Sequence, residues 1–132
     1  MANRYGEAAI LAVRQGIYGT SAAARWESAL EKLYPTSPAA RKKSAPRGAF
    51  LGLCEAGLVQ GIPAGEYTRA KDDKAYAVRA AALLLEGTQR WSRSALWQAV
   101  TEGAAVEHDG QMDIVLALWN NNLIVGKPQA EE

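Results

Sequence analysis

The chain has 132 residues, 48% of them hydrophobic and 22% charged, which is enough apolar material for one compact core and too little length for two large domains. Its 15 Lys and Arg residues nearly balance its 14 Asp and Glu residues, so no global electric field draws it to nucleic acid or anionic membrane. The chain lacks an apolar run of the roughly 20 residues that span a bilayer, a secretion signal and a second cysteine for a disulfide. We therefore expect one cytoplasmic domain, residues 1–132, without membrane contact.

Apolar residues recur at helical spacing in six segments, and most of these segments follow a residue that favours helix N-caps. We expect helices over about residues 4–15, 22–33, 45–56, 73–86, 93–102 and 110–121. The predicted N-caps are Asn3, Thr20 or Ser21, Ser44, Asp72 or Asp73, Ser92 and Asp109. The sequence thus predicts an all-α fold, a single domain of about six helices, with residues 34–45 and 61–71 as connections.

The third of these helices has the clearest ends. Pro46 falls in its first turn, where a missing N–H costs nothing. Gly57 is placed to adopt the left-handed conformation just past the helix, which would bring Leu58 against Leu53 in a Schellman ending. Gly16 and Gly19 are expected to break the chain after the first helix.

The helices also recur in an internal pattern. Tyr5 and Trp26 are separated by the same interval as Tyr76 and Trp97 (26 − 5 = 97 − 76 = 21). The third helices align at an offset of 65, which pairs Gly57 with Asn122, another residue that tolerates the left-handed conformation. We interpret the chain as two pseudo-repeated three-helix units, about residues 3–63 and 72–128, with a frayed tail at 126–132; the alternative is a chance similarity between apolar helices.

A basic run precedes the third helix and is the strongest candidate for a binding site. Arg41, Lys42, Lys43 and Arg47 fall within seven positions that contain no acid, beside a helix N-terminus that adds positive potential. This pattern predicts contact with phosphate, as in nucleic acid, or with a partner. A solvated loop that only keeps the protein soluble explains it equally well.

The corresponding loop of the second unit is acidic. It contains Glu107 and Asp109, and Asp113 follows in the next helix. Two equivalent loops of opposite sign indicate either different ligands or an attraction between the loops of neighbouring molecules.

Trp91 and the Cys/His pair are the remaining candidates. Trp91 precedes a helix start, where it would either expose an aromatic ring to a partner or staple the first helical turn. Cys54 and His108 could form a nucleophilic pair, oriented by Asp109 or Asp113. A core position for Cys54 on the apolar stripe and an ordinary exposed imidazole for His108 are the simpler interpretation, and no cofactor or metal motif is present.

Two resemblances add to this picture. The segment AFLGLCEAGLVQGIP, preceded by RKK and followed by QMDIVLALWNNNLI, resembles a family of small uncharacterised bacterial proteins with a domain of unknown function. The turn at residues 55–59 is also similar to the recognition-helix ending of winged helix-turn-helix regulators. Here the turn before the helix is about a dozen residues long, against the usual three or four, and no β wing is evident.

The function we expect from the sequence is a non-enzymatic protein-interaction module that binds a partner protein or a second copy of itself. The alternative is a nucleic-acid-binding regulator that uses the basic loop of residues 41–47. An enzyme assembled from scattered polar residues is the third class.

Overall fold

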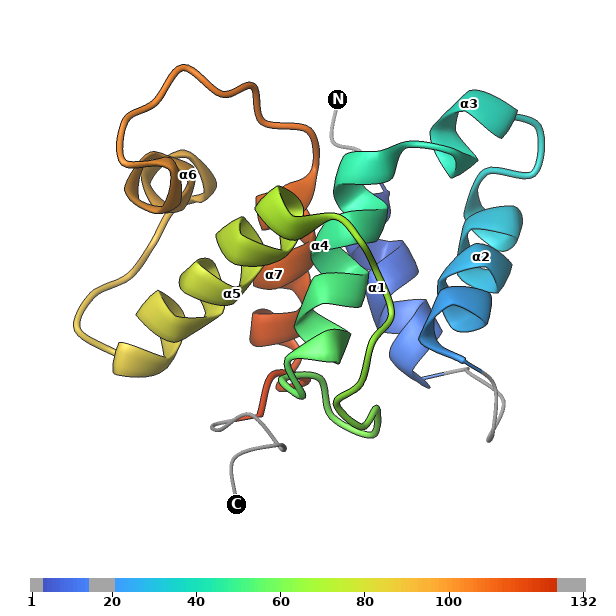
Figure 1. Ribbon diagram of the computed structural model, residues 1–132, viewed down its shortest axis with the longest axis horizontal. Coiled ribbons are helices and arrows are strands. Elements are labelled where there is room, and N and C mark those ends of the chain that lie inside the picture. The colour runs from blue at the N-terminus through green and yellow to red at the C-terminus, as the bar shows by residue number, and fades with distance from the viewer. Residues whose placement is uncertain (1–3, 15–20, 126–132) are drawn as a thin grey trace.

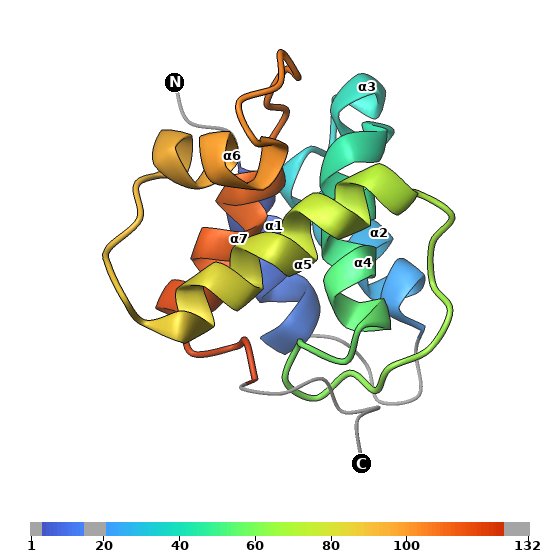
Figure 2. The ribbon, with the colours of Figure 1, turned by 60° about the vertical axis from the view of Figure 1, so that its left-hand side comes forward.

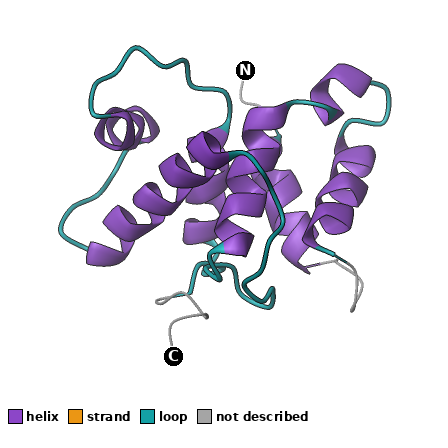
Figure 3. Ribbon diagram, in the orientation of Figure 1, coloured by secondary structure: helices purple, strands orange, loops and turns teal. Residues whose placement is uncertain are grey.

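The computed structural model describes residues 4–14 and 21–125, and these residues form seven helices. The helices are α1 (Tyr5–Arg14), α2 (Ala22–Leu33), α3 (Pro38–Arg41), α4 (Ser44–Glu55), α5 (Lys71–Glu86), α6 (Arg93–Thr101) and α7 (Gln111–Asn120). Figure 3 shows helices and loops only in this part of the chain, which contains no strand beyond one antiparallel bridge between Val59 and Ile124. The all-α prediction is confirmed, and so are six main helices.

Helices α4 and α7 lie at the centre of the molecule (Figures 1 and 2). Helix α5 packs across α4 on one side, and α1 packs on α7 and α2 on the other. Helix α6 lies at the edge, against α5 and α7. The core between them contains Trp26, Phe50, Leu53, Leu96 and Leu118, none of which is exposed. Among the described residues, no helix is long and apolar enough to cross a membrane.

Two of the predicted caps are confirmed at the atomic level. The hydroxyl of Ser21 accepts a hydrogen bond from the amide of Ala24 at 3.1 Å, and that of Ser92 accepts one from Ala95 at 3.1 Å. Each bond satisfies an amide in the first helical turn that has no partner within the helix. Local sequence therefore determines where α2 and α6 begin.

The predicted caps of α4, α5 and α7 are wrong by one to three residues. Lys43 is the N-cap of α4 and makes no side-chain cap hydrogen bond, so Ser44 is the first residue of the helix. Helix α5 begins after Ala70, so Asp72 and Asp73 lie inside its first turn. Gly110, not Asp109, caps α7.

The connection before α4 is more ordered than the sequence indicates. Residues 38–41 form the one-turn helix α3, where the hydroxyl of Ser37 accepts a hydrogen bond from the amide of Ala40 at 3.3 Å. The hydroxyl of Tyr5 donates to the carbonyl of Ala40 at 2.9 Å, which fastens this turn to α1.

The C-terminal ends of α4 and α7 adopt the same Schellman geometry. Gly57 and Asn122 both have positive φ, at 76° and 61°. The amide that follows each of them donates back to a helix carbonyl, from Leu58 to Leu53 at 3.1 Å and from Leu123 to Leu118 at 2.9 Å. The predicted roles of Gly57 and Asn122 are confirmed.

The same two helix ends pair with each other. The amide of Gln60 donates to Leu123 and the amide of Val125 donates to Leu58, both at 2.9 Å, on either side of the bridge between Val59 and Ile124. Duplication of the whole three-helix unit stays a prediction. The expectations for Asn3, Gly16, Gly19, Thr20 and residues 126–132 lie outside the described residues.

Substitutions at the two Schellman positions should have unequal effects on stability, because only one of them places a branched side chain at positive φ. Gly57→Val is expected to destabilise the protein by about 1–2 kcal/mol or more, because a branched side chain clashes with its own backbone at positive φ. Asn122→Gly should be nearly neutral, since glycine adopts that conformation freely. Urea unfolding of both variants measures the difference, and equal losses would contradict it.

A close approach between α4 and α5 positions the surface described below. A Cβ atom added at Gly52 would lie 2.6 Å from the Cα atom of Lys74, and one at Gly48 would lie 2.8 Å from the Cβ atom of Ala70. The two glycines, one helical turn apart, therefore let the start of α5 lie directly on α4. This contact brings Lys74 to the C-terminal half of α4.

Candidate functional site

The cations of the predicted basic site are largely engaged within the chain. Arg41 donates to the carbonyl of Tyr34 at 2.7 Å and to that of Pro35 at 3.0 Å, which holds the turn between α2 and α3. Arg47 lies 3.7 Å from a carboxylate oxygen of Glu27. Lys42 is exposed at the C-terminal end of α3. Arg41 and Arg47 of the basic run thus contact other residues of the same chain.

The two loops of opposite sign meet within one molecule. The Nζ atom of Lys43 lies 3.0 Å from Oδ1 of Asp109, and both side chains are close to half exposed. One pair of opposite charges from these loops is therefore matched inside the chain, whereas different ligands for the two loops and a contact between the loops of neighbouring molecules stay predictions. An ion pair this exposed contributes little stability. Glu107 of the acidic loop is exposed.

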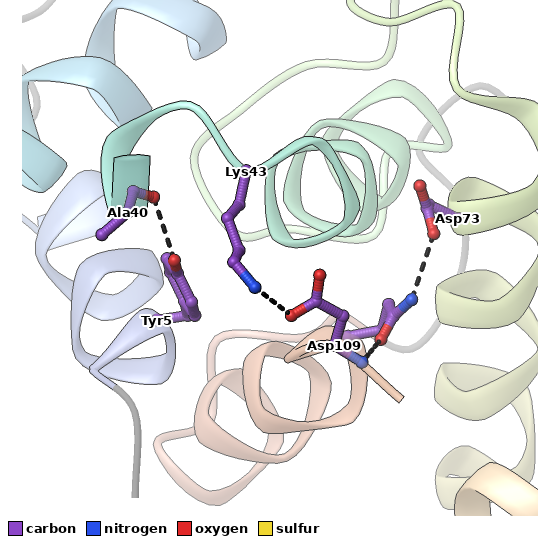
Figure 4. A network of polar contacts seen from close by, with 6 residues as sticks. Tyr5, Ala40, Lys43, Asp73 and Asp109 are labelled. Atoms are coloured by element: carbon purple, nitrogen blue, oxygen red, sulfur yellow. Dashed lines mark hydrogen bonds and ion pairs between the residues drawn. The ribbon is translucent and has the colours of Figure 1, made fainter. Parts of the chain in front are cut away.

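A polar cluster continues from this ion pair toward α5. The side chain of Gln111 is buried, accepts a hydrogen bond from the Asp109 amide at 2.7 Å and donates to Oδ1 of Asp73 at 3.2 Å. Figure 4 shows Lys43 and Asp73 on opposite sides of Asp109, with Tyr5 and Ala40 alongside. Burial raises the pKa of Asp73, and the negative charges of Asp72 and Asp109 raise it further. The hydrogen bond from Gln111 acts in the opposite direction, but the pKa remains raised. The cluster joins the starts of α4, α5 and α7.

His108 lies inside this cluster and helps to cap α7, so its expected description as an ordinary exposed imidazole is wrong. Its Nε2 atom accepts a hydrogen bond from the amide of Met112 at 3.1 Å, which requires the neutral ring. The ring packs edge to face on Trp97 with centroids 5.0 Å apart. Burial lowers the pKa of His108, and the positive charge of Arg93 lowers it further. The negative charges of Asp113 and Asp109 act in the opposite direction, but the pKa remains lowered.

The protein is expected to lose stability on acidification because of His108. The unfolded imidazole titrates near pH 6.5, whereas the folded one holds its proton only at lower pH. Below about pH 6.5 the unfolded state therefore binds more protons, and the free energy of unfolding falls as pH drops toward 5. In His108→Gln, whose amide oxygen can accept the same bond without titrating, this slope should be smaller. Chemical unfolding at several pH values measures it, and an unchanged slope would contradict the assignment.

Asp113 and Trp91 also have structural surroundings. Asp113 accepts a hydrogen bond from Arg93 at 2.9 Å, which ties α7 to α6. Trp91 is half-buried and packs against the core, so it is not the exposed ring that the partner hypothesis requires. Its indole nitrogen is buried and has no hydrogen-bond partner among the described residues.

The Cys/His pair is not assembled. Cys54 is fully buried in α4, and burial raises the pKa of its thiol, which keeps it protonated. The Nε2 atom of His108 is occupied by the amide of Met112, at the start of a different helix. Among the described residues, no group of three or more His, Cys, Asp or Glu residues is placed to hold a metal ion.

A surface groove that the sequence did not indicate lies where α4 ends and α5 begins. Residues 56–70, which we call the strap, leave α4, pass along it and enter α5 without helical structure (Figures 1 and 2). The groove between the strap and α5 has a volume of about 550 Å³, and we call it the docking groove. Its apolar wall consists of Ala56, Ala70, Ala75 and Val78, each of them only partly buried.

One carboxylate holds the strap in place. Oε2 of Glu55 accepts hydrogen bonds from the amides of Tyr67 at 2.8 Å and Thr68 at 3.2 Å, and Oε1 lies 2.8 Å from Nζ of Lys74. Burial alone would raise the pKa of Glu55, but these three hydrogen bonds and the Lys74 charge outweigh it and lower the pKa. The carboxylate is thus ionised at neutral pH and fixes the strap against α5.

The charged rim of the docking groove is basic. Lys71, Lys74 and Arg79 line it, and Glu55, which is paired with Lys74, is its acidic residue. Sequence analysis missed these residues because Lys71, Lys74 and Arg79 are dispersed along one helix face rather than clustered in a run. The spacing of three positions between Lys71 and Lys74, which makes them neighbours on the helix surface, was the available signal.

The fold and the groove define a small helical domain with a basic-rimmed apolar groove on its surface. The chain belongs to a family of unknown function, DUF6979, whose family model matches residues 2–125. No curated protein matches the chain, and neither does any solved structure. The resemblance to an uncharacterised family is therefore confirmed, whereas the described residues contain no hairpin that could serve as a β wing.

Proposed function

We propose that this protein is a non-enzymatic protein-interaction module of the bacterial cytoplasm, and that a segment of a partner protein docks in the docking groove. One observation carries the proposal: a groove of about 550 Å³, with an apolar wall of partly buried side chains, lies open on the surface between the strap and α5. Among the described residues, Val106, with an exposed fraction of 38%, is the large hydrophobic side chain left at the surface.

The shape of the docking groove favours a chain segment over a compact small molecule. Its residues on α5 run from Lys71 through Ala75 and Val78 to Arg79. At 1.5 Å per residue this stretch is about 12 Å long, or about two helical turns. The small side chains of Ala56, Ala70 and Ala75 leave room for apolar side chains of a partner, as in helix-in-groove recognition. The Glu55 hydrogen bonds fix the groove in advance, which reduces the entropy cost of docking.

The alternative function, a nucleic-acid-binding regulator, depends on residues 41–47. Three of the four cations there already contact Tyr34, Asp109 and Glu27 within the chain. Nucleic-acid binding needs several phosphate contacts, each of which contributes to a steep salt dependence. We rank this function second because Lys42 alone offers a cation without such a contact among the described residues of the run.

Peptide display tests the proposed function. Random peptides are selected for binding to the immobilised protein. Peptides that also bind the Val78→Asp variant are then discarded, because a carboxylate on the apolar wall should abolish docking in the groove. Val106→Asp makes the same exchange at an exposed position outside the groove and should retain the selected peptides. Peptides that bind the parent and Val106→Asp, but not Val78→Asp, support the proposal. Failure to enrich any peptide that discriminates the two variants would overturn it.

A further inference from the structure

We infer that the segment that docks in this groove is acidic, with carboxylate side chains beside apolar ones; this inference rests on the proposed function. The rim carries three cations, Lys71, Lys74 and Arg79, against the single acid Glu55. A partner with complementary charge would associate faster, and a basic partner would be rejected by like charges across a narrow groove.

Each rim cation retains capacity for a ligand carboxylate. Lys71 is exposed at the first residue of α5, where the helix N-terminus adds positive potential. Lys74 contacts Glu55, yet its side chain remains 37% exposed. Arg79 is exposed and uses Nη1 to donate to the carbonyl of Val100 at 2.8 Å, which leaves its remaining N–H groups free of that contact.

The positive surface continues on the other side of the strap. A second groove of about 510 Å³ is lined there by Arg47 and Arg69, with Glu66 as its acid. Thr68 lines both grooves, so the strap forms the ridge between them. A segment longer than the docking groove would cross this ridge and meet Arg69, which is exposed, and this favours an acidic stretch over a single carboxylate.

The wall of the docking groove argues against nucleic acid as the anionic ligand. Within the described part of the chain, the residues that line it include no aromatic side chain on which bases could stack. Its apolar wall would instead face a sugar-phosphate backbone without compensating contacts. An acidic polypeptide supplies both the charge and the apolar side chains that the groove accommodates.

A matched pair of peptides tests the inference. One is an amphipathic peptide of Glu, Leu and Ala, and the other has Lys in place of every Glu. Binding of each peptide to the full chain is measured by fluorescence anisotropy at low and high salt. The acidic peptide should bind at least about tenfold more tightly at low salt, and Lys71→Glu should remove most of that preference. Lys42→Glu changes the net charge equally, outside the groove, and should alter the affinity by less than about twofold.

The outcomes separate this inference from the proposed function. Equal binding of both peptides, abolished by Val78→Asp, would overturn the acidic preference and leave the docking groove in place. Loss of binding in Lys42→Glu as large as in Lys71→Glu would also overturn it, because attraction would then follow net charge. If neither peptide binds and display enriches none, both proposals fail. Displacement of the acidic peptide by a single-stranded oligonucleotide would assign the rim to nucleic acid instead.

Discussion

Trp26→Ala is expected to lower the free energy of unfolding by about 3–5 kcal/mol, because it removes the largest fully buried side chain of the core. The Trp26 ring stacks on Phe50 with centroids 5.1 Å apart, which joins α2 to α4. Its indole nitrogen is buried and has no hydrogen-bond partner among the described residues, so the loss comes from packing alone. Urea unfolding followed by circular dichroism measures the change.

Ser28→Ala is the control for this loss. Ser28 is exposed on the same helix, and its replacement should change the free energy of unfolding by no more than about 0.5 kcal/mol. Trp26→Phe should cost less than Trp26→Ala, since it keeps an aromatic ring against Phe50 and removes an unsatisfied donor. Similar, small effects of all three substitutions would show that α2 does not pack on α4 as described.

Gly52→Val is expected to destabilise the protein by about 3 kcal/mol, despite replacing glycine in a helix by a better helix former. A Cβ atom at this position would lie 2.6 Å from the backbone of Lys74, so α4 and α5 must move apart. The movement would also pull Lys74 away from Glu55 and distort the docking groove. Thermal unfolding measures the stability, and the selected peptides report the groove.

Ala82→Val isolates the local contribution of a β-branched side chain to this result. Ala82 is exposed on α5, where valine should cost only about 0.5 kcal/mol through helix propensity. If Gly52→Val proves as mild as Ala82→Val, the close approach of α4 and α5 is wrong.

The sequence predicted those features of the fold that depend on neighbouring residues. Hydroxyl caps at Ser21 and Ser92 act within one helical turn, and the left-handed positions at Gly57 and Asn122 follow from backbone sterics. Apolar residues at helical spacing predicted the helix over residues 22–33, and Trp26 of that helix is fully buried. Local chemistry was sufficient in each of these cases.

Features that depend on distant residues could not be predicted in the same way. Asp109 was expected to cap α7, but its carboxylate pairs with Lys43, which is 66 positions away (109 − 43), and His108 accepts the helix amide instead. Glu55 appeared to be an ordinary residue at the end of a helix, yet it organises the strap and Lys74. Packing of α7 on α4 brings Lys43 and Asp109 together, and packing of α5 on α4 brings Lys74 to Glu55.

Nuclear magnetic resonance of the isotopically labelled protein, titrated with a peptide selected by display, tests the central claim most directly. The account predicts that the amide signals of Ala56, Thr68, Ala75 and Val78 shift progressively as the peptide is added, because these residues line the docking groove. Signals of residues 41–43 should stay unchanged. Two results would contradict the assignment of the docking groove as the binding surface. One is that only the signals of residues 41–47 shift, and the other is that the peptide binds while the signals of the groove residues do not shift.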